Sequence, residues 1–154
     1  MKVMVVTPYL PHRQIGHGGG LAVRDLITSL AGKHEVLVAS LLRRGEEPLV
    51  DEVRDLGVQV AVRPFLDDRA RGPAAVRLAG DRTAAWLRSL LAGYPLYVQK
   101  YWSPGSERWL AGLVADFAPA AVQLEYLQLA LLCRGLRRER DRTGAAEPRL
   151  VLNS

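Results

Sequence analysis

The fold of this chain is decided by one stretch near its N-terminus, VMVVTPYLPHRQIGHGGGLAVRDLITSLAGKHEVLVAS, which covers Val3–Ser40. It begins with Val3–Thr7, an apolar and β-branched run typical of strands that are buried on both faces of a parallel sheet. Val36–Ser40 is a second run of this kind. Between the two runs, apolar residues recur at the spacing of one helix face, namely at Val23, Leu26, Ile27 and Leu30. The stretch therefore predicts a β-α-β unit with two parallel strands.

The same alternation continues along the rest of the chain. Further helices are predicted over residues 48–56, 74–91, 104–117 and 127–142, and further strands over residues 58–62, 120–124 and 149–153. This order predicts an α/β fold with one Rossmann-like, doubly wound parallel sheet and helices on both faces. A length of 154 residues fits one domain, residues 1–154. Ligands of such sheets bind beyond the carboxyl ends of the strands, which directs attention to residues 7–20, 40–47, 125–126 and 153–154.

The composition is that of an ordinary globular protein, with 49% hydrophobic and 24% charged residues. The net charge of +5, carried mostly by arginine, favours anionic ligands or surfaces. Cys133 is the single cysteine, so an intramolecular disulfide is impossible and a reducing compartment is expected. No segment reads as a signal peptide or reaches the length of a membrane span, so we expect a cytoplasmic protein.

Glycine is concentrated where the first helix is expected to begin. Gly16, Gly18, Gly19 and Gly20 precede Leu21, the first residue of the predicted helix. Glycine lets the backbone approach a ligand with no Cβ in the way, and the free N–H groups of a helix N-terminus favour an anion. The spacing fits neither the dinucleotide fingerprint nor the P-loop. We expect a phosphate or a sugar hydroxyl here, and the alternative is a flexible tip or tight turn.

An ordered series of motifs runs along essentially the whole chain: a short strand, TPYLPH, the glycine run, VRDLITSLAGKHEVLVASL and VQLEY. This series resembles the N-terminal domain of the retaining, GT-B-fold glycosyltransferases of family four. In that family two Rossmann-like domains face each other across a cleft, and the C-terminal one holds a nucleotide sugar while the N-terminal one shapes the acceptor site. The resemblance implies transfer of a sugar from a nucleotide-sugar donor to an acceptor, with no cofactor besides that donor.

The resemblance also implies roles for the first loop. It brings the loop close to the diphosphate or the transferred sugar of the donor, through Gly18, Gly19 and Gly20, with Gly16 and His17 flanking. From their chemistry, Arg13 can pair with a phosphate and His17 can donate a hydrogen bond to one. The alternative for both side chains is a solvated loop position.

Glu125 and Tyr126 follow a predicted strand, so they are expected to face the cleft. There they can bind an acceptor hydroxyl or position a sugar, and Glu125 and His17 are the two candidates for a catalytic role. The alternative is that Tyr126 packs in the interior while Glu125 caps the next helix. The three histidines and one cysteine show no metal-ligand spacing, so no metal site is expected.

The chain also departs from the family pattern. Many members carry a histidine just after the strand that corresponds to residues 150–153, whereas this sequence stops at Ser154, before such a residue and before the donor-binding domain. We therefore expect no transfer by this chain alone, and a C-terminal donor-binding domain as its partner. The alternative function is a non-catalytic Rossmann-like binding or interaction domain, including a degenerate remnant of such an enzyme.

The predicted helix over residues 74–91 combines arginines with an apolar face. Basic side chains border it at Arg69, Arg71, Arg77, Arg82 and Arg88, and the apolar face carries Trp86, Leu87, Leu90 and Leu91. Such a helix can lie on an anionic membrane. Peripheral contact with the inner face of the membrane would suit a lipid-linked acceptor. The alternative is a helix packed on the sheet with a charged outer face. No nucleic-acid partner is expected, since the basic residues are spread along the chain and aromatics are few.

Overall fold

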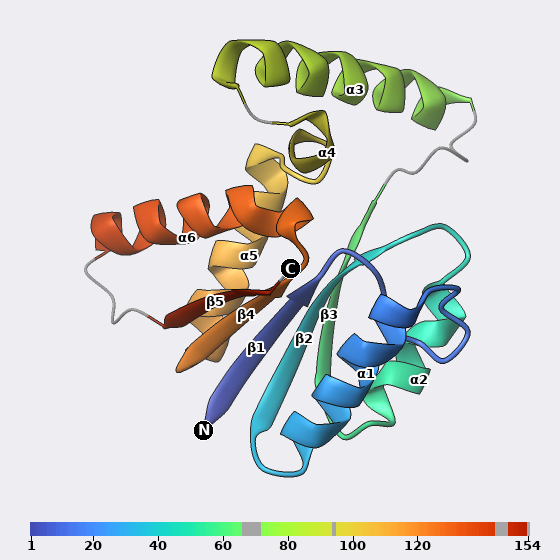
Figure 1. Ribbon diagram of the computed structural model, residues 1–154, viewed down its shortest axis with the longest axis vertical. Helices are drawn as coiled ribbons and strands as arrows, with labels where there is room; N and C mark the ends of the chain where they lie inside the picture. Colours follow the sequence, from blue (N-terminus) through green and yellow to red (C-terminus); the bar gives the residue numbers. More distant parts are fainter. Residues whose placement is uncertain (66–71, 94, 144–147, 154) are drawn as a thin grey trace.

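A five-stranded, all-parallel sheet with helices on both faces forms the computed structural model (Figure 1), which describes residues 1–65, 72–93, 95–143 and 148–153. The strands are β1 (Lys2–Thr7), β2 (Glu35–Leu42), β3 (Gln59–Pro64), β4 (Ala121–Glu125) and β5 (Arg149–Asn153). The helices are α1 (Gly18–Ala31), α2 (Val50–Arg54), α3 (Pro73–Ala92), α4 (Leu96–Gln99), α5 (Pro104–Phe117) and α6 (Ala130–Thr143). The predicted α/β fold class is confirmed.

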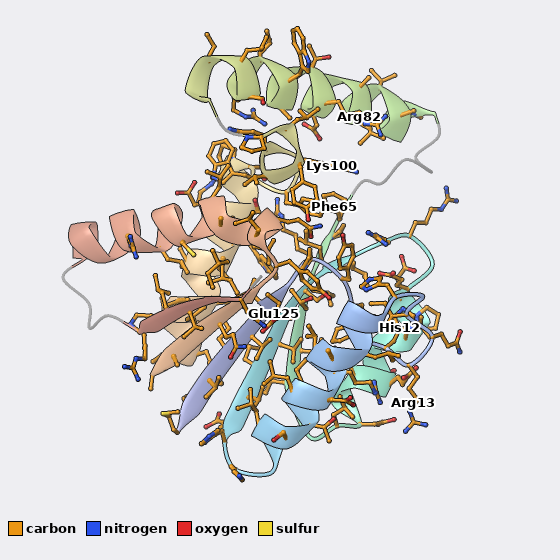
Figure 2. All side chains as sticks on the ribbon, viewed as in Figure 1. His12, Arg13, Phe65, Arg82, Lys100 and Glu125 are labelled. Atoms are coloured by element: carbon orange, nitrogen blue, oxygen red, sulfur yellow. The ribbon has the colours of Figure 1, made fainter. Side chains whose placement is uncertain are left out.

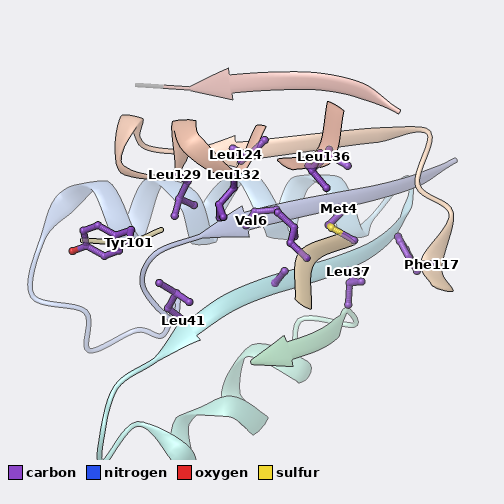
Figure 3. Packing of buried hydrophobic residues seen from close by; sticks show 13 residues of the cluster. Met4, Val6, Leu37, Leu41, Tyr101, Phe117, Leu124, Leu129, Leu132 and Leu136 are labelled. Carbon is purple, nitrogen blue, oxygen red and sulfur yellow. The ribbon is translucent and has the colours of Figure 1, made fainter. Parts of the chain in front are cut away.

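Alternate side chains of each central strand supply two separate hydrophobic cores. Val3 and Val5 of β1 pack toward α1 and α2, in a cluster that includes Val23, Ile27, Val50 and Val53. Met4 and Val6 point to the other face and pack toward α5 and α6 (Figure 3), together with Leu110, Phe117, Leu132 and Leu136. Burial on both faces explains why these strands read as continuous apolar runs in the sequence.

The strand order in the sheet is β3-β2-β1-β4-β5, with all strands parallel. Successive strands are first added on one side of β1 and then on the other, so the topological switch point lies between β1 and β4. The chain leaves β1 through α1 and returns to the sheet at β2 on one side, and it later reaches β4 on the other side (Figure 1). The loops after β1 and β4 therefore diverge from each other at the carboxyl edge. A crevice at such a switch point is the usual ligand site of an open α/β sheet.

The boundaries of two helical segments differ from the prediction. Helix α1 begins at Gly18 and not at Leu21, because the His17 side chain caps it by accepting a hydrogen bond from the Gly20 amide. The interruption predicted before Pro95 is followed by the short helix α4, which was not predicted. The start of α5 agrees with the prediction, since Ser103 forms a capping box with Ser106 and Pro104 fills the first turn.

Helix α3 does not pack on the sheet, contrary to one of the two predicted alternatives. It lies beyond the carboxyl edge of the sheet and packs against α4 (Figure 1). Its predicted apolar stripe is turned outward, with Leu90 64% and Leu91 87% exposed, while its buried side chains include Leu78 and Ala85. Arg69, Arg71 and the side chain of Arg77 lie outside the described part of the chain.

Candidate functional site

Three aromatic rings meet at the switch point of the sheet. Tyr9 comes from the loop after β1, His17 from the start of α1, and Tyr126 from the residue after β4. The Tyr9 ring lies edge-to-face with His17 at 5.0 Å and with Tyr126 at 5.8 Å between centroids. We call these residues the aromatic cluster. It joins the two loops that diverge at the carboxyl edge.

His17 is oriented by the helix that it caps. Its Nδ1 accepts a hydrogen bond from the Gly20 amide at 3.1 Å. A ring nitrogen that accepts a hydrogen bond carries no proton, so the other nitrogen, Nε2, carries it. The exposed His17 ring can therefore donate from Nε2 to an oxygen of a ligand.

The glycines of the loop differ in what surrounds them. A Cβ placed on Gly16 or Gly18 would meet no heavy atom within 4 Å in the described part of the chain, so both leave open backbone. A Cβ on Gly19 would lie 2.5 Å from the Tyr126 hydroxyl, and a Cβ on Gly20 would overlap the side chain of Ile15. Internal packing thus explains Gly19 and Gly20, whereas Gly16 and Gly18 stay accessible to a ligand.

We expect Gly19→Ala to lower the free energy of unfolding by about 1–2 kcal/mol, since overpacking costs about 1–3 kcal/mol and the gain in helix propensity offsets part of it. In a Tyr126→Phe background the same change should cost about 0.5 kcal/mol or less, because the hydroxyl that the new Cβ would strike is gone. Urea denaturation of the four proteins measures this coupling. Gly18→Ala is the matched control and should not destabilise. If Gly19→Ala lowered the free energy of unfolding equally in both backgrounds, the close approach of Gly19 to the Tyr126 hydroxyl would be contradicted.

The backbone at Tyr126 is strained. Its φ of 73° lies where residues other than glycine are uncommon, and such positions persist where the surroundings hold them. Here the Tyr126 amide donates to the carbonyl of Asn153 at 2.8 Å, and its carbonyl accepts from Leu129 at 3.1 Å. The buried Tyr126 Oη has no hydrogen-bond partner among the described residues. Burial and the charge of Glu125 raise the pKa of Tyr126 above its ordinary value, so the hydroxyl remains a donor.

Glu125 occupies the last position of β4 and is 3% exposed. Its Oε1 accepts a hydrogen bond from Nε2 of the Gln123 side chain at 2.6 Å, and its Oε2 accepts one from Nδ2 of the Asn153 side chain at 3.0 Å. Both oxygens are thus engaged by neighbours on β4 and β5. In this arrangement the carboxylate ties the ends of two strands together and offers little accessible surface to an acceptor hydroxyl.

An ion pair between a largely buried arginine and a partly buried glutamate fixes the loop between β1 and α1. The Nη1 of Arg24 on α1 donates to the carbonyl of Pro11 at 3.1 Å and lies 3.2 Å from Oε1 of Glu52 on α2. The same Glu52 oxygen accepts from the backbone amide of Arg13 at 2.7 Å. Figure 2 shows Arg13 on the side of α2, so its exposed side chain lies away from the aromatic cluster.

A cavity of about 610 Å³ opens between the first loop and the loop after β2. We call it the loop cavity, and its volume is in the range of small-molecule sites. The first loop contributes Gly16, His17 and the buried His12, which is 7% exposed. The Nδ1 of His12 has no hydrogen-bond partner in residues 1–65, 72–93, 95–143 and 148–153. A buried polar atom without a partner favours a polar ligand in this cavity.

Positive charge surrounds the same cavity. Arg43 and Arg44 line it from the loop after β2, and Lys100 lines it from the turn after α4. The Arg43 guanidinium lies 4.5 Å from the centre of the Tyr9 ring, which orients it beside the aromatic cluster. Glu46 is the acid in the lining, and it accepts from the Arg43 amide at 2.9 Å. The lining thus suits an anion.

The structure brings some predicted site residues together and separates others. Gly16, His17, Gly18 and Tyr126 lie around the switch point, whereas Arg13 faces α2 and Gly20 is buried. The sequence alone did not predict a role for Arg43, Arg44 or Lys100, nor the anchoring role of Arg24. Arg43 and Arg44 fall within residues 40–47, a segment flagged by topology, and their charge was the available signal.

No protein-family model matches this chain, and no curated protein matches it either. Among the described residues, no group of three or more His, Cys, Asp or Glu side chains could hold a metal ion. None of the helices in the described ranges is both long and apolar enough to cross a membrane.

Proposed function

We propose that this chain is the acceptor-side domain of a retaining glycosyltransferase, which acts together with a second domain that holds a nucleotide sugar. The observation that carries the proposal is the open backbone at Gly16 and Gly18, next to a cavity lined by Arg43 and Arg44 at the carboxyl edge of the sheet. Exposed amides of a helix N-terminus and guanidinium groups are both suited to a diphosphate. The order of sequence motifs along the chain supports the same assignment.

The proposed chemistry uses these groups as electrostatic catalysts. The bond between the anomeric carbon and the diphosphate oxygen breaks, and its electron pair stays on the nucleoside diphosphate. The acceptor oxygen bonds to the anomeric carbon on the same face, and its proton passes to an oxygen of the leaving diphosphate. Arg43, the Gly18 amide and Nε2 of His17 stabilise the negative charge that grows on the leaving group. Binding of an acceptor by Tyr126 and Glu125 remains a prediction, and the burial of Glu125 favours Tyr126 for this contact.

Titration of the ¹⁵N-labelled chain with inorganic diphosphate tests the anion site. We expect the amide signals of Gly16, His17 and Gly18 to move together with a dissociation constant of about 1 mM, as befits half of a site. The variant Arg43→Gln/Arg44→Gln should bind at least about tenfold more weakly, since each hydrogen bond to a charged group contributes about 1.5–3 kcal/mol. The proposed diphosphate site would be contradicted if these amide signals did not move, or if the signals that moved belonged to residues near exposed arginines elsewhere in the chain.

The matched control is Arg54→Gln/Arg108→Gln, which removes the same charge from α2 and α5, outside the cavity lining. It should bind diphosphate like the parent protein.

The reading frame after Ser154 gives an independent test of the enzyme assignment. A second α/β domain with a histidine soon after β5 is expected, and a stop codon would favour the alternative of a non-catalytic domain or a split enzyme.

A further inference from the structure

A second cavity, of about 750 Å³, lies beyond the carboxyl ends of β2 and β3. Helices α3 and α4 and the start of α5 complete its walls, and we call it the helix cavity. Phe65 and Lys100 line both cavities, so the helix cavity and the loop cavity share a wall. Figure 2 shows Phe65 and Lys100 between the sheet and α4, with Arg82 on α3. The helix cavity is not lined by any of the residues 16–20 at the start of α1.

The lining of the helix cavity combines aromatic rings with guanidinium groups. Phe65 stacks on Tyr101 with parallel rings 5.1 Å apart. Arg88 of α3 lies 5.2 Å from the centre of the Trp102 ring, and its buried Nε has no hydrogen-bond partner among the described residues. Arg63 enters from the end of β3. This combination suits a ligand that has both an anionic group and an apolar part.

An exposed apolar surface continues from the mouth of the helix cavity. It consists of side chains on α3 and α4 that are 45% to 87% exposed, and we call it the α3–α4 stripe: Trp86, Leu87, Leu90, Leu91, Leu96 and Tyr97. Trp86 and Leu96 belong to both the stripe and the cavity lining, so the two surfaces are continuous. Exposed apolar patches that are rimmed by polar residues mark interaction sites.

We propose that the helix cavity and the α3–α4 stripe together bind an anionic membrane lipid. Arg63 and Arg88 contact the lipid phosphate, and the stripe enters the boundary between headgroups and acyl chains. Tryptophan and leucine next to arginine are the residues by which an amphipathic helix lies in that boundary. The inference concerns a cavity and a ligand that differ from those of the proposed sugar transfer, so each can fail without the other.

Charge decides between a membrane and a second copy of this chain as the occupant. The net charge of +5 and the arginines beside the stripe would repel an identical surface, whereas they attract anionic headgroups. The α3–α4 stripe faces outward, and α3 packs on α4 and not on the sheet, so the stripe can enter a bilayer surface without uncovering either core.

Co-sedimentation with vesicles tests this inference. We expect the chain to bind vesicles of phosphatidylcholine with 30% phosphatidylglycerol at least about tenfold more tightly than pure phosphatidylcholine, because headgroup charge drives the attraction. Tryptophan emission should shift to shorter wavelength on binding, and Trp86→Phe should remove most of that shift. Leu90→Ser/Leu91→Ser should abolish binding while the unfolding midpoint is retained.

Arginine variants test the phosphate contact. Arg63→Gln/Arg88→Gln should reduce binding to anionic vesicles at least about tenfold, and Arg88→Gln alone covers the case in which the double variant fails to fold. Arg54→Gln/Arg108→Gln is the charge-matched control and should bind like the parent chain. Equal binding to both vesicle types would overturn the proposal, as would saturable binding of glycerol phosphate without vesicle binding. Dimerisation that is lost in Leu90→Ser/Leu91→Ser, without vesicle binding, would also overturn it in favour of self-association.

Discussion

Replacing Arg24 by methionine should lower the free energy of unfolding by about 2–4 kcal/mol, because the Arg24 side chain is largely buried and its partner Glu52 is only 26% exposed. The Arg24 side chain holds both the Pro11 carbonyl and the Glu52 carboxylate, and methionine satisfies neither of them while it fills a similar volume. Denaturation by urea, followed by circular dichroism, measures the change.

Arg54→Met is the matched control for this prediction. Arg54 also pairs with an acid, Asp51, at a short distance of 2.7 Å, but both side chains are exposed. Exposed pairs contribute about 0–1 kcal/mol, so the same substitution should cost little there. If Arg24→Met costs no more than Arg54→Met, the anchor between α1 and α2 does not hold the loop.

The same substitution connects stability to the loop cavity. Arg24 and Glu52 fix Pro11 and the Arg13 amide, which flank the buried His12 in the cavity lining. When the pair is lost, the loop that presents His12 and Gly16 is released at its centre. We therefore expect diphosphate to bind more weakly to Arg24→Met even though Arg24 itself does not line the cavity.

The strands were predictable because burial on both faces leaves a strong signal. Val3–Thr7 and Val36–Ser40 consist almost entirely of apolar or small residues, as is typical of parallel strands that are covered on both faces. Helix α3 was less predictable for a physical reason. Its leucines have the spacing of a helix that packs on a sheet, but they are exposed in the structure. Spacing alone does not tell whether such an apolar face packs on the sheet of the same chain or faces outward.

The candidate site was located by topology, but its chemistry was only partly predictable. Glycines after the first strand pointed to the carboxyl edge, yet the sequence could not separate Gly18, which is open, from Gly19, which accommodates the Tyr126 hydroxyl. That distinction depends on a contact between residues far apart in the chain. The role of Arg24 was hidden for the same reason, since Glu52 reaches it from another helix.

The shared wall of the two cavities gives the two proposals a spatial relation. Phe65 and Lys100 separate the loop cavity from the helix cavity, and both cavities lie at the carboxyl edge of the sheet. A lipid held in the helix cavity would therefore lie next to the proposed diphosphate site. If both proposals hold, the bound lipid and the sugar donor lie on opposite sides of Phe65 and Lys100.

Glu125→Ala is expected to lower the free energy of unfolding by about 2–3 kcal/mol, because it removes a buried carboxylate that accepts two hydrogen bonds from side-chain amides. The amides of Gln123 and Asn153 each donate to one Glu125 oxygen, and the second of these bonds links β4 to β5. Urea denaturation gives the size of the effect. Amide hydrogen exchange of Tyr126, which donates to the Asn153 carbonyl, should become faster as the end of β5 loosens.

Glu35→Ala is the control for Glu125→Ala, because Glu35 is also a strand glutamate that accepts from a side-chain amide, that of Gln59 at 3.2 Å. Its side chain is half exposed, so water replaces the lost acceptor and the cost should stay within about 0.5 kcal/mol. The comparison also separates two roles of Glu125. If Glu125 mainly connects β4 to β5, its replacement should cause a large loss of stability. If its carboxylate only binds an acceptor or transfers a proton, the loss should be no larger than that of Glu35→Ala. Since both Glu125 oxygens are already engaged, we expect the first result, and the second would return Glu125 to the catalytic candidates.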